Sequence, residues 1–133
     1  MLFFVYLRNV GLSTDFQPKR SEVWLVNLEP TLGAEIRKTR PVVVISSNSI
    51  GKLPIKLVVP ITDWKTSFAR NLWHIQLEPD DENGLTKVSA IDTLQLRGVD
   101  TQRFIRKLGK LSSEKVAEVA LVIAAVIELQ PED

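Results

Sequence analysis

The chain has 133 residues, 17 of them Lys or Arg and 16 Asp or Glu, with one histidine and no cysteine, and 44% of it is hydrophobic. This length is typical of one domain, and the apolar content is sufficient for a core without disulfides. The lack of cysteine excludes thiolate metal sites and a cysteine nucleophile, and one histidine excludes a two-histidine catalytic pair within a subunit. No run approaches the roughly 20 apolar residues that span a bilayer, and nothing indicates an oxidising compartment, so we expect a cytoplasmic protein without a membrane partner.

Residues 1–18 form an extension whose role the sequence leaves open. Its apolar run, residues 2–7, is too short to cross a membrane and lacks the basic flank and cleavage site of a signal peptide. The run fits an additional strand, a contact with a partner or a translation-start artefact. The predicted domain covers residues 19–130, and residues 131–133 form a tail.

Apolar and β-branched runs predict five strands. They cover residues 22–29, 42–45, 57–62, 72–77 and 89–97. Four consecutive β-branched residues in the second run predict a strand buried on both faces. Pro60 in the third implies an edge position or a bulge that ends pairing close to Thr62. The fourth alternates apolar and polar residues, which places His74 on its polar side, solvated or locally hydrogen-bonded.

A helix is predicted to follow, with Ser112 as its N-cap and Leu111 and Val116 as a hydrophobic staple. Apolar residues at helical spacing continue to Ile127, and the opposite side of the helix is apolar too. Such a helix is either deeply buried or covered by a second subunit, and in so short a chain we favour a subunit interface. Five strands followed by one helix indicate an α+β fold with a small, curled, barrel-like antiparallel sheet.

The net charge of +1 hides a segregation of charge along the chain. Basic residues concentrate in segments 31–40 and 97–115, whereas acidic residues concentrate in loop 78–82 and near the C-terminus. The basic segments fit either ordinary solvated faces or an anionic partner. We interpret the acidic loop as solvated rather than as a cation site, so no metal is expected.

The side chains best placed for chemistry are an arginine and a hydroxyl. Arg40 ends the charged loop directly before the buried strand, where a fixed backbone can present its guanidinium to a phosphate as a bidentate donor. Thr62 ends the third strand, and its hydroxyl can donate to a phosphate oxygen. If the two strand ends are neighbours, both side chains face one groove. The alternative is that Arg40 forms a surface ion pair with Glu35 and Thr62 is an ordinary strand-end hydroxyl.

Several segments carry, in their order and spacing, a resemblance to a known family. They are residues 19–30 (KRSEVWLVNLEP), 33–35 (GAE), 39–48 (TRPVVVISSN), 59–62 (VPIT), 84–85 (GL), 95–103 (QLRGVDTQR) and 108–112 (LGKLS). Over residues 19–129 the chain resembles the MazF/PemK family of toxin endoribonucleases. The resemblance implies an SH3-like barrel with a C-terminal helix, acting as a homodimer with no cofactor. It also implies metal-independent cleavage of single-stranded RNA, mRNA in particular, and inhibition by an acidic MazE-like antitoxin that covers the RNA groove.

The resemblance also assigns roles to individual residues. The family's catalytic Arg and Thr fall on Arg40 and Thr62, and the glycine and acid of its mobile active-site loop fall on Gly33 and Glu35. Arg40 is the expected charge stabiliser, Thr62 orients the phosphate, and Glu35 either accepts the 2′-OH proton or positions Arg40. The candidate RNA-binding residues, which combine phosphate-attracting cations with polar groups for base edges or backbone, are Gly33, Arg37, Lys38, Ser46, Asn48, Ser89, Gln95 and Arg97.

Two positions depart from the family pattern. Ile36 stands where a Gln often follows the acid, and Leu94 stands where many members have an acid before the Gln of the fifth strand, so base preference stays open. Two other functions also stay open on the sequence. One is a gyrase-binding toxin of the same small-barrel kind, which cleaves nothing and uses its apolar helix as the working surface; the other is a catalytically silent RNA-binding relative.

Overall fold

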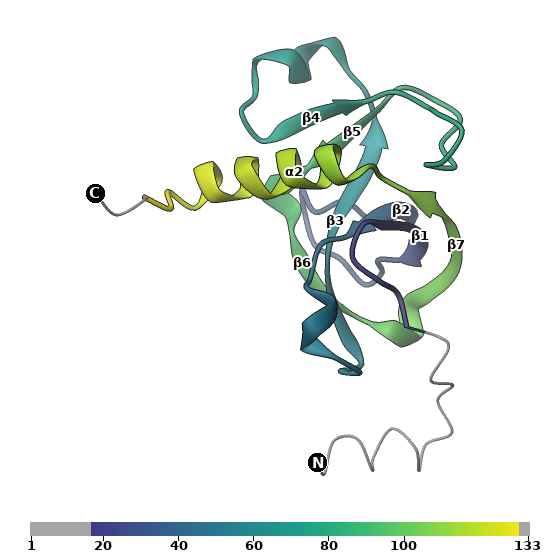
Figure 1. Ribbon diagram of the computed structural model, residues 1–133. Coiled ribbons are helices and arrows are strands. Elements are labelled where there is room, and N and C mark those ends of the chain that lie inside the picture. Colours follow the sequence, from purple (N-terminus) through teal and green to yellow (C-terminus); the bar gives the residue numbers. More distant parts are fainter. Residues whose placement is uncertain (1–16, 131–133) are drawn as a thin grey trace.

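The computed structural model describes residues 17–130, so the tail 131–133 and all but the last two residues of the extension lie outside the described residues. Residues 17–130 form a curled antiparallel sheet of seven strands and a C-terminal helix (Figure 1). The strands and the helix are β1 (Glu22–Asn27), β2 (Thr39–Val44), β3 (Ile55–Asp63), β4 (His74–Leu77), β5 (Ser89–Asp92), β6 (Arg97–Asp100), β7 (Phe104–Lys110) and α2 (Ser113–Val126). The 3-10 turns between them are η1 (Asn48–Ile50), η2 (Thr66–Arg70), η3 (Thr93–Gln95) and η4 (Thr101–Arg103). No helix described between residues 17 and 130 is long and apolar enough to cross a bilayer.

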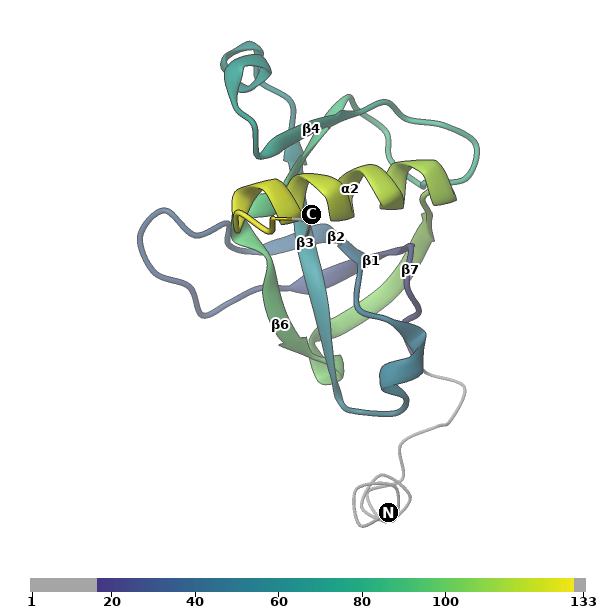
Figure 2. The ribbon, with the colours of Figure 1, turned by 60° about the vertical axis from the view of Figure 1, so that its left-hand side comes forward.

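The strands pair in the order β4-β5-β3-β2-β1-β7, and β6 pairs with the first half of β3. β3 is long enough to serve two neighbours on one side, because residues 55–58 pair with β6 and residues 61–63 with β5. α2 lies across one face of the sheet (Figure 2). The expected α+β class with a curled antiparallel sheet and a C-terminal helix is confirmed. Over the described residues the ladder stays open, with β4 and β7 at its two ends.

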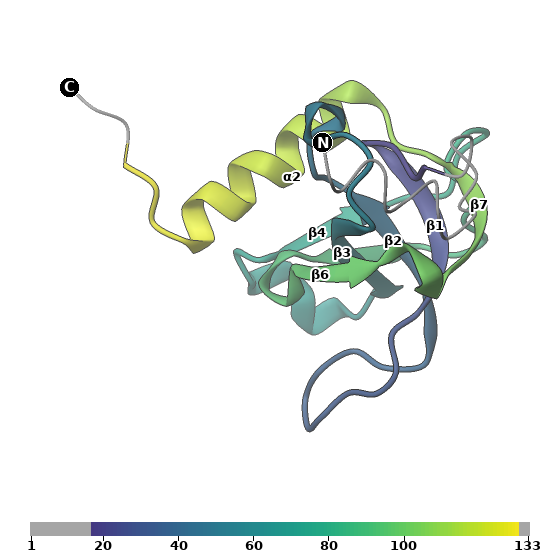
Figure 3. The same ribbon diagram turned by 90° about the horizontal axis from the view of Figure 1, so that it is seen from below.

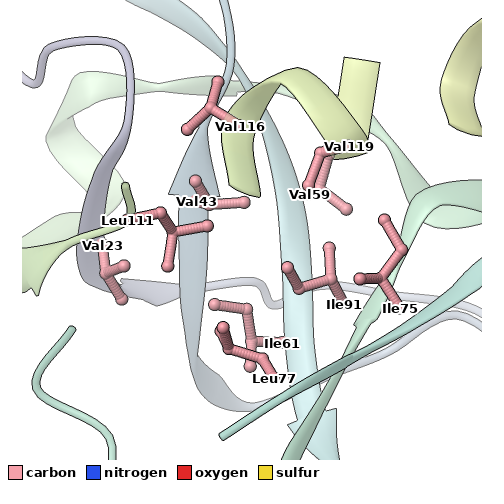
Figure 4. Packing of buried hydrophobic residues seen from close by; sticks show 10 residues of the cluster. All are labelled: Val23, Val43, Val59, Ile61, Ile75, Leu77, Ile91, Leu111, Val116 and Val119. Carbon is pink, nitrogen blue, oxygen red and sulfur yellow. The ribbon is translucent and has the colours of Figure 1, made fainter. Parts of the chain in front are cut away.

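The sheet has a hydrophobic core on each of its two faces. Val42, Val43 and Val44 of β2 are all fully buried, and successive residues of a strand point to opposite faces. The cluster under α2, drawn in Figure 4, contains Val23, Val43, Val59, Ile61, Ile75, Leu77, Ile91, Leu111, Val116 and Val119. Val42 and Val44 belong to a second cluster with Trp24 and Phe104. The prediction of a strand buried on both faces is confirmed, because each face has its own core.

α2 begins where the sequence predicts it. The Ser112 hydroxyl accepts a hydrogen bond from a backbone N–H in the first turn at 3.1 Å. Leu111 and Val116, the predicted staple, are both buried in the cluster under the helix. The helix buries Val116 and Val119, whereas Leu121 is 72% exposed. The second apolar side of the helix therefore lies on the surface of the single chain.

Residues 89–97 form two strands rather than the single predicted one. The Asp92 carboxylate accepts a hydrogen bond from the Leu94 N–H at 3.2 Å and caps turn η3, which interrupts the extended chain. An aspartate that bonds the backbone two residues on favours a turn over a strand. β7 was not predicted, because its exposed basic residues hide any apolar alternation. Such residues are common on strands at the edge of a sheet.

Pro60 does not mark an edge strand, because β3 lies in the middle of the sheet. It stands opposite Val42 of β2, between the part of β3 that pairs with β6 and the part that pairs with β5. A proline lacks the N–H that a ladder needs, so the point where β3 changes partner tolerates it. Pairing continues to Asp63, close to the predicted end.

His74 is locally hydrogen-bonded and not solvated, since its side chain is only 6% exposed. Its Nε2 lies 3.4 Å from the carboxylate of Asp92, which stands opposite on β5, and its Nδ1 lies 3.1 Å from Asn71 Nδ2. Phe68 of η2 stacks on the imidazole with ring centroids 3.8 Å apart. The segment around η2 therefore covers the polar side of β4, and of the two predicted environments His74 has the locally hydrogen-bonded one.

Two glycines bring the loop after β4 against β7. A Cβ on Gly84 would lie 2.2 Å from the Leu108 carbonyl oxygen, and a Cβ on Gly109 would lie 2.0 Å from the Glu82 carbonyl oxygen. Neither position leaves room for a side chain, and Gly84 also has a φ of +71°, which favours glycine. This close approach fixes the start of the segment that leads into β5.

Candidate functional site

The ends of β2 and β3 bring Arg40 and Thr62 together. Val42 lies opposite Pro60; Arg40 is two residues before Val42 and Thr62 two residues after Pro60, toward the same end of this antiparallel pair. Residues two apart on a strand share a face, so both side chains lie on the same side of this sheet end. Both are partly buried. They line one groove of about 210 Å³, whose other walls are Pro41, Ile61, Asp63, Leu85, Thr86, Lys87 and Ser89.

Arg40 is held by strand β1 on one side and by a bond to the preceding loop. It stands opposite the fully buried Val26 of β1. Its Nε donates a long 3.4 Å hydrogen bond to the Arg37 carbonyl of the preceding loop. No ion pair joins Arg40 to Glu35 within residues 17–130. The surface ion pair considered as the alternative is therefore not formed, and the planar fork of donors lines the groove.

The third wall of the groove is the segment that leads into β5. Ser89 stands opposite Asp63 and is buried, and its hydroxyl donates to the Lys87 carbonyl at 2.9 Å. Lys87 is exposed, with its ammonium 4.0 Å from the Asp63 carboxylate. Sequence reasoning missed Lys87. The position of Lys87 just before the fifth strand could have identified it. The start of an antiparallel strand lies beside the end of its partner, and Thr62 stands at that end.

The loop between β1 and β2 carries four of the predicted site residues. It projects from the end of the sheet at which β2 begins (Figure 3). Gly33, with φ of +60°, and Lys38, with φ of +70°, take left-handed backbone conformations that bend the loop. The Glu35 carboxylate accepts a hydrogen bond from the Leu32 N–H at 2.6 Å. Arg37 and Lys38 are exposed, so their charges face solvent next to the groove end of β2.

Glu35 lines a second cavity, separate from the groove of Arg40 and Thr62. This cavity of about 390 Å³ lies between the loop and turn η3. Its walls are Ala34, Glu35, Leu94, Gln95, Leu96 and Arg97. The structure therefore divides the predicted catalytic trio: Arg40 and Thr62 share one groove, and Glu35 lines the other cavity from the loop.

Gln95 and Arg97 bond to the backbone of the β1–β2 connection. Gln95 Oε1 accepts from the Ile36 N–H at 2.6 Å, and Gln95 Nε2 donates to the Ala34 carbonyl at 3.2 Å. Arg97 donates to the Leu28 carbonyl at 3.2 Å. Their polar groups thus tie the loop to the body of the domain, a role that the sequence did not predict.

Ser46 and Asn48 are not brought to the groove. They follow the C-terminal end of β2, whereas the groove lies at its N-terminal end, and six strand residues span about 20 Å. The Ser46 hydroxyl is buried and accepts from the Leu57 N–H at 3.2 Å, and Asn48 accepts from the Arg20 N–H at 2.8 Å. Both side chains bond the backbone of neighbouring segments, so in this structure they serve the fold.

Comparison with known proteins assigns the family. The family described as PemK-like, MazF-like toxin of type II toxin–antitoxin systems matches residues 19–127. The chain belongs to this family. Endoribonuclease MazF9 of Mycobacterium tuberculosis is 28% identical over 107 residues, which cover 76% of this chain and 88% of that protein. The match includes both strands that carry the groove and the helix that covers the core.

Solved structures of the PemK/MazF family share this fold. MazF from Deinococcus radiodurans superposes with a TM-score of 0.69 at 20% identity, over 84% of this chain and 97% of that one. An endoribonuclease in complex with its cognate antitoxin, from a mycobacterial species, gives a TM-score of 0.68 at 14% identity, over 87% of this chain and 100% of that one. At these identities the likeness establishes the architecture of the domain.

Proposed function

We propose that this toxin is a metal-independent endoribonuclease that cleaves single-stranded RNA, including mRNA, at a short sequence. One observation carries the proposal: Arg40 and Thr62, from two adjacent strands, line a single groove that also holds Lys87. This arrangement offers a charged donor fork, a hydroxyl and a second cation to one phosphate. The endoribonuclease among its relatives supports the same reading.

The reaction uses a nucleophile that the substrate itself supplies. The 2′-oxygen of RNA attacks the neighbouring phosphorus, the bond from phosphorus to the 5′-oxygen breaks, and the products are a 2′,3′-cyclic phosphate and a 5′-OH. One proton leaves the 2′-OH and one is delivered to the 5′-oxygen, so the step needs no co-reactant. The protein has to hold the two oxygens in line and stabilise the added negative charge.

Arg40 stabilises the charge that develops on the phosphate oxygens. Its backbone is fixed by pairing with β1, so its donors are in place before RNA arrives. A preorganised donor aimed at developing charge is worth about 3–4 kcal/mol, by analogy with oxyanion holes. Thr62 orients the same phosphate through its hydroxyl, and Lys87 adds a positive charge at the mouth of the groove.

Glu35 supplies the carboxylate of the loop. It either accepts the 2′-OH proton or positions Arg40, and in both roles the position of the loop decides where its carboxylate lies relative to the groove. Arg37 and Lys38, exposed on the same loop, attract the RNA backbone. In-line geometry requires a splayed nucleotide, so the substrate is single-stranded.

The partners follow from the same surfaces. An acidic, extended segment of a MazE-like antitoxin covers the basic groove and so inhibits the enzyme. A second copy of the chain covers exposed apolar side chains of β3, α2 and the residue that ends the helix, including Ile55 (52% exposed), Leu57 (42%), Leu121 (72%) and Ile127 (67%). Because its substrate is cellular mRNA, the toxin acts in the cytoplasm.

Arg40→Ala tests the function directly. We expect it to lower cleavage of single-stranded RNA in EDTA by about 10²–10³-fold or more, because it removes the main charge stabiliser. Arg106→Ala, which removes an exposed arginine on the edge strand β7, is the matched control and retains cleavage. Thermal unfolding reports that both variants fold, and end-mapping of the products identifies the cyclic phosphate.

Undiminished cleavage by folded Arg40→Ala would remove the proposal. A wild-type protein that cleaves no RNA but inhibits gyrase would restore the gyrase-binding alternative. RNA binding without cleavage by the wild type would identify a catalytically silent relative.

A further inference from the structure

Gln95 ends turn η3 and reaches across to the β1–β2 loop. Its amide oxygen accepts a hydrogen bond from the Ile36 N–H at 2.6 Å, and its amide nitrogen donates one to the Ala34 carbonyl at 3.2 Å. These two backbone groups flank Glu35, the residue whose carboxylate the cleavage reaction needs on this loop. A side-chain amide that brackets one residue in this way fixes the backbone of that residue on both sides.

Apart from Ile36, which packs against the second core cluster, the loop tip has little else to hold it against the domain. Leu32, at the tip, is 83% exposed, and Glu35 is exposed as well. Other bonds of the loop tip are short in sequence, such as Glu35 N–H to the Leu32 carbonyl at 3.2 Å. The bonds to Gln95 link residues about 60 apart in sequence, so they set where the tip lies relative to the groove.

Turn η3 is a rigid base for this side chain. The Thr93 N–H and hydroxyl both donate to the Trp73 carbonyl, at 2.9 and 2.8 Å, and Thr93 is buried. The Asp92 carboxylate caps the turn through the Leu94 N–H. After the turn, Leu96 packs against the core cluster under α2. Gln95 is therefore anchored to the body of the domain on both sides of its own position in the chain.

We propose that Gln95 is a positioning residue, which clamps the β1–β2 loop and thereby sets the position of Glu35 relative to the Arg40–Thr62 groove. The inference rests on the proposed function and goes beyond it, because the resemblance suggested Gln95 as an RNA contact. Both amide groups are occupied by the loop backbone, so Gln95 acts on the loop and not on a base edge. The position of the loop, and through it the position of Glu35, is then set by η3.

Two variants test the clamp against the direct RNA contact. Gln95→Met keeps the length of the side chain and removes both hydrogen bonds. Gln95→Glu keeps an acceptor for the Ile36 N–H but turns a carboxylate oxygen toward the Ala34 carbonyl. The matched control is Gln102→Met, the same substitution at an exposed glutamine on the neighbouring turn η4.

The first readout is amide hydrogen exchange of the RNA-free protein, which does not depend on activity. Gln95→Met should exchange the Ile36 N–H about tenfold or more faster, because that N–H loses its acceptor. Gln102→Met should leave the rate unchanged. An unchanged Ile36 rate in folded Gln95→Met overturns the clamp. Because this readout uses no RNA, it decides the clamp even if the wild type cleaves nothing and the proposed function fails.

The second readout is the kinetics of cleavage of a single-stranded RNA that contains the mapped cleavage sequence. A misplaced Glu35 lowers kcat about 10–100-fold while KM changes little. Gln95→Glu should be intermediate, and its rate relative to the wild type should rise as the pH falls from 8 to 5. A protonated carboxyl can again donate to the Ala34 carbonyl, and an ordinary glutamate has a pKa of about 4.3.

Two kinetic results would overturn the positioning role. A changed cleavage sequence with kcat intact would make Gln95 a base reader. Faster Ile36 exchange with wild-type kcat would mean that the clamp does not serve catalysis. If Gln95→Met does not fold, Gln95→Ala removes the same amide and carries the same two readouts.

Discussion

The candidate site consists of a strand-borne part and a loop-borne part that are held by different forces. Arg40, Thr62 and Ser89 lie on strands whose pairing and packed cores fix them. Glu35 and Arg37 lie on a projecting loop, which is attached to the domain by individual side chains such as that of Gln95. The first part depends on the same contacts as the fold itself, whereas the second depends on few contacts, so we expect it to open without unfolding the domain.

The proposed reaction requires a fixed position of the strand-borne groups and a movable position of the loop-borne groups. Groups that stabilise developing charge work best when they are fixed before the substrate arrives. Groups that capture a flexible RNA strand, or bring a proton acceptor to it, have to let the strand in and out. The molecule therefore keeps Arg40 on a buried strand and Glu35 on a loop. Three predictions test this division.

The largest expected effect is on the stability of the strand-borne part. Ile91 of β5 is fully buried opposite Ile61, so Ile91→Ala should lower the free energy of unfolding by about 3 kcal/mol, measured by urea denaturation. Leu32→Ala on the loop is the matched control and should change it by less than about 0.5 kcal/mol, because Leu32 is 83% exposed. A comparable loss in both variants would mean that the loop belongs to the cooperative core.

The next effect is on the rate of cleavage. Thr62→Val keeps the shape of the side chain and removes the hydroxyl, so kcat should fall about 10–100-fold, the value of one hydrogen bond to a charged group. Thr62→Ser should retain most of the rate. Thr66→Val, at an exposed threonine of η2, is the control for the substitution itself. Equal loss in Thr62→Val and Thr62→Ser would show that packing, and not the hydroxyl, carries the effect.

The strand-borne part could largely be predicted from the sequence. The run of β-branched residues after Arg40 and the proline before Thr62 located two strand ends, and the resemblance supplied their roles. Sequence could not show that Lys87 completes the groove, because that follows from how β5 pairs with β3. It also could not separate Ser46 and Asn48 from the site, because they lie close to Arg40 in the chain and at the far end of the strand in space.

The loop-borne part could be predicted only as a set of residue types. Charge and glycine marked segment 31–40 as a loop, but nothing in the sequence placed Glu35 in a separate cavity from Arg40. The reason is that loop position depends on contacts made from distant residues, here Gln95. The same limit hid turn η3, since a single hydrogen bond from the Asp92 side chain divides what reads as one strand.

The smallest expected effect is on the salt dependence of RNA binding. Arg37→Gln and Lys38→Gln remove exposed loop charges, so each should reduce the slope of log affinity against log salt by roughly 0.7–1, as expected for one phosphate contact. Binding is measured in the Arg40→Ala background, where RNA stays intact, with Arg106→Gln on β7 as the control.

In the background that retains Arg40, kcat should not change, because Arg37 and Lys38 attract RNA and do not touch the reacting atoms. A fall in kcat with an unchanged salt slope would contradict the division, since it would place these loop cations at the scissile phosphate together with Arg40.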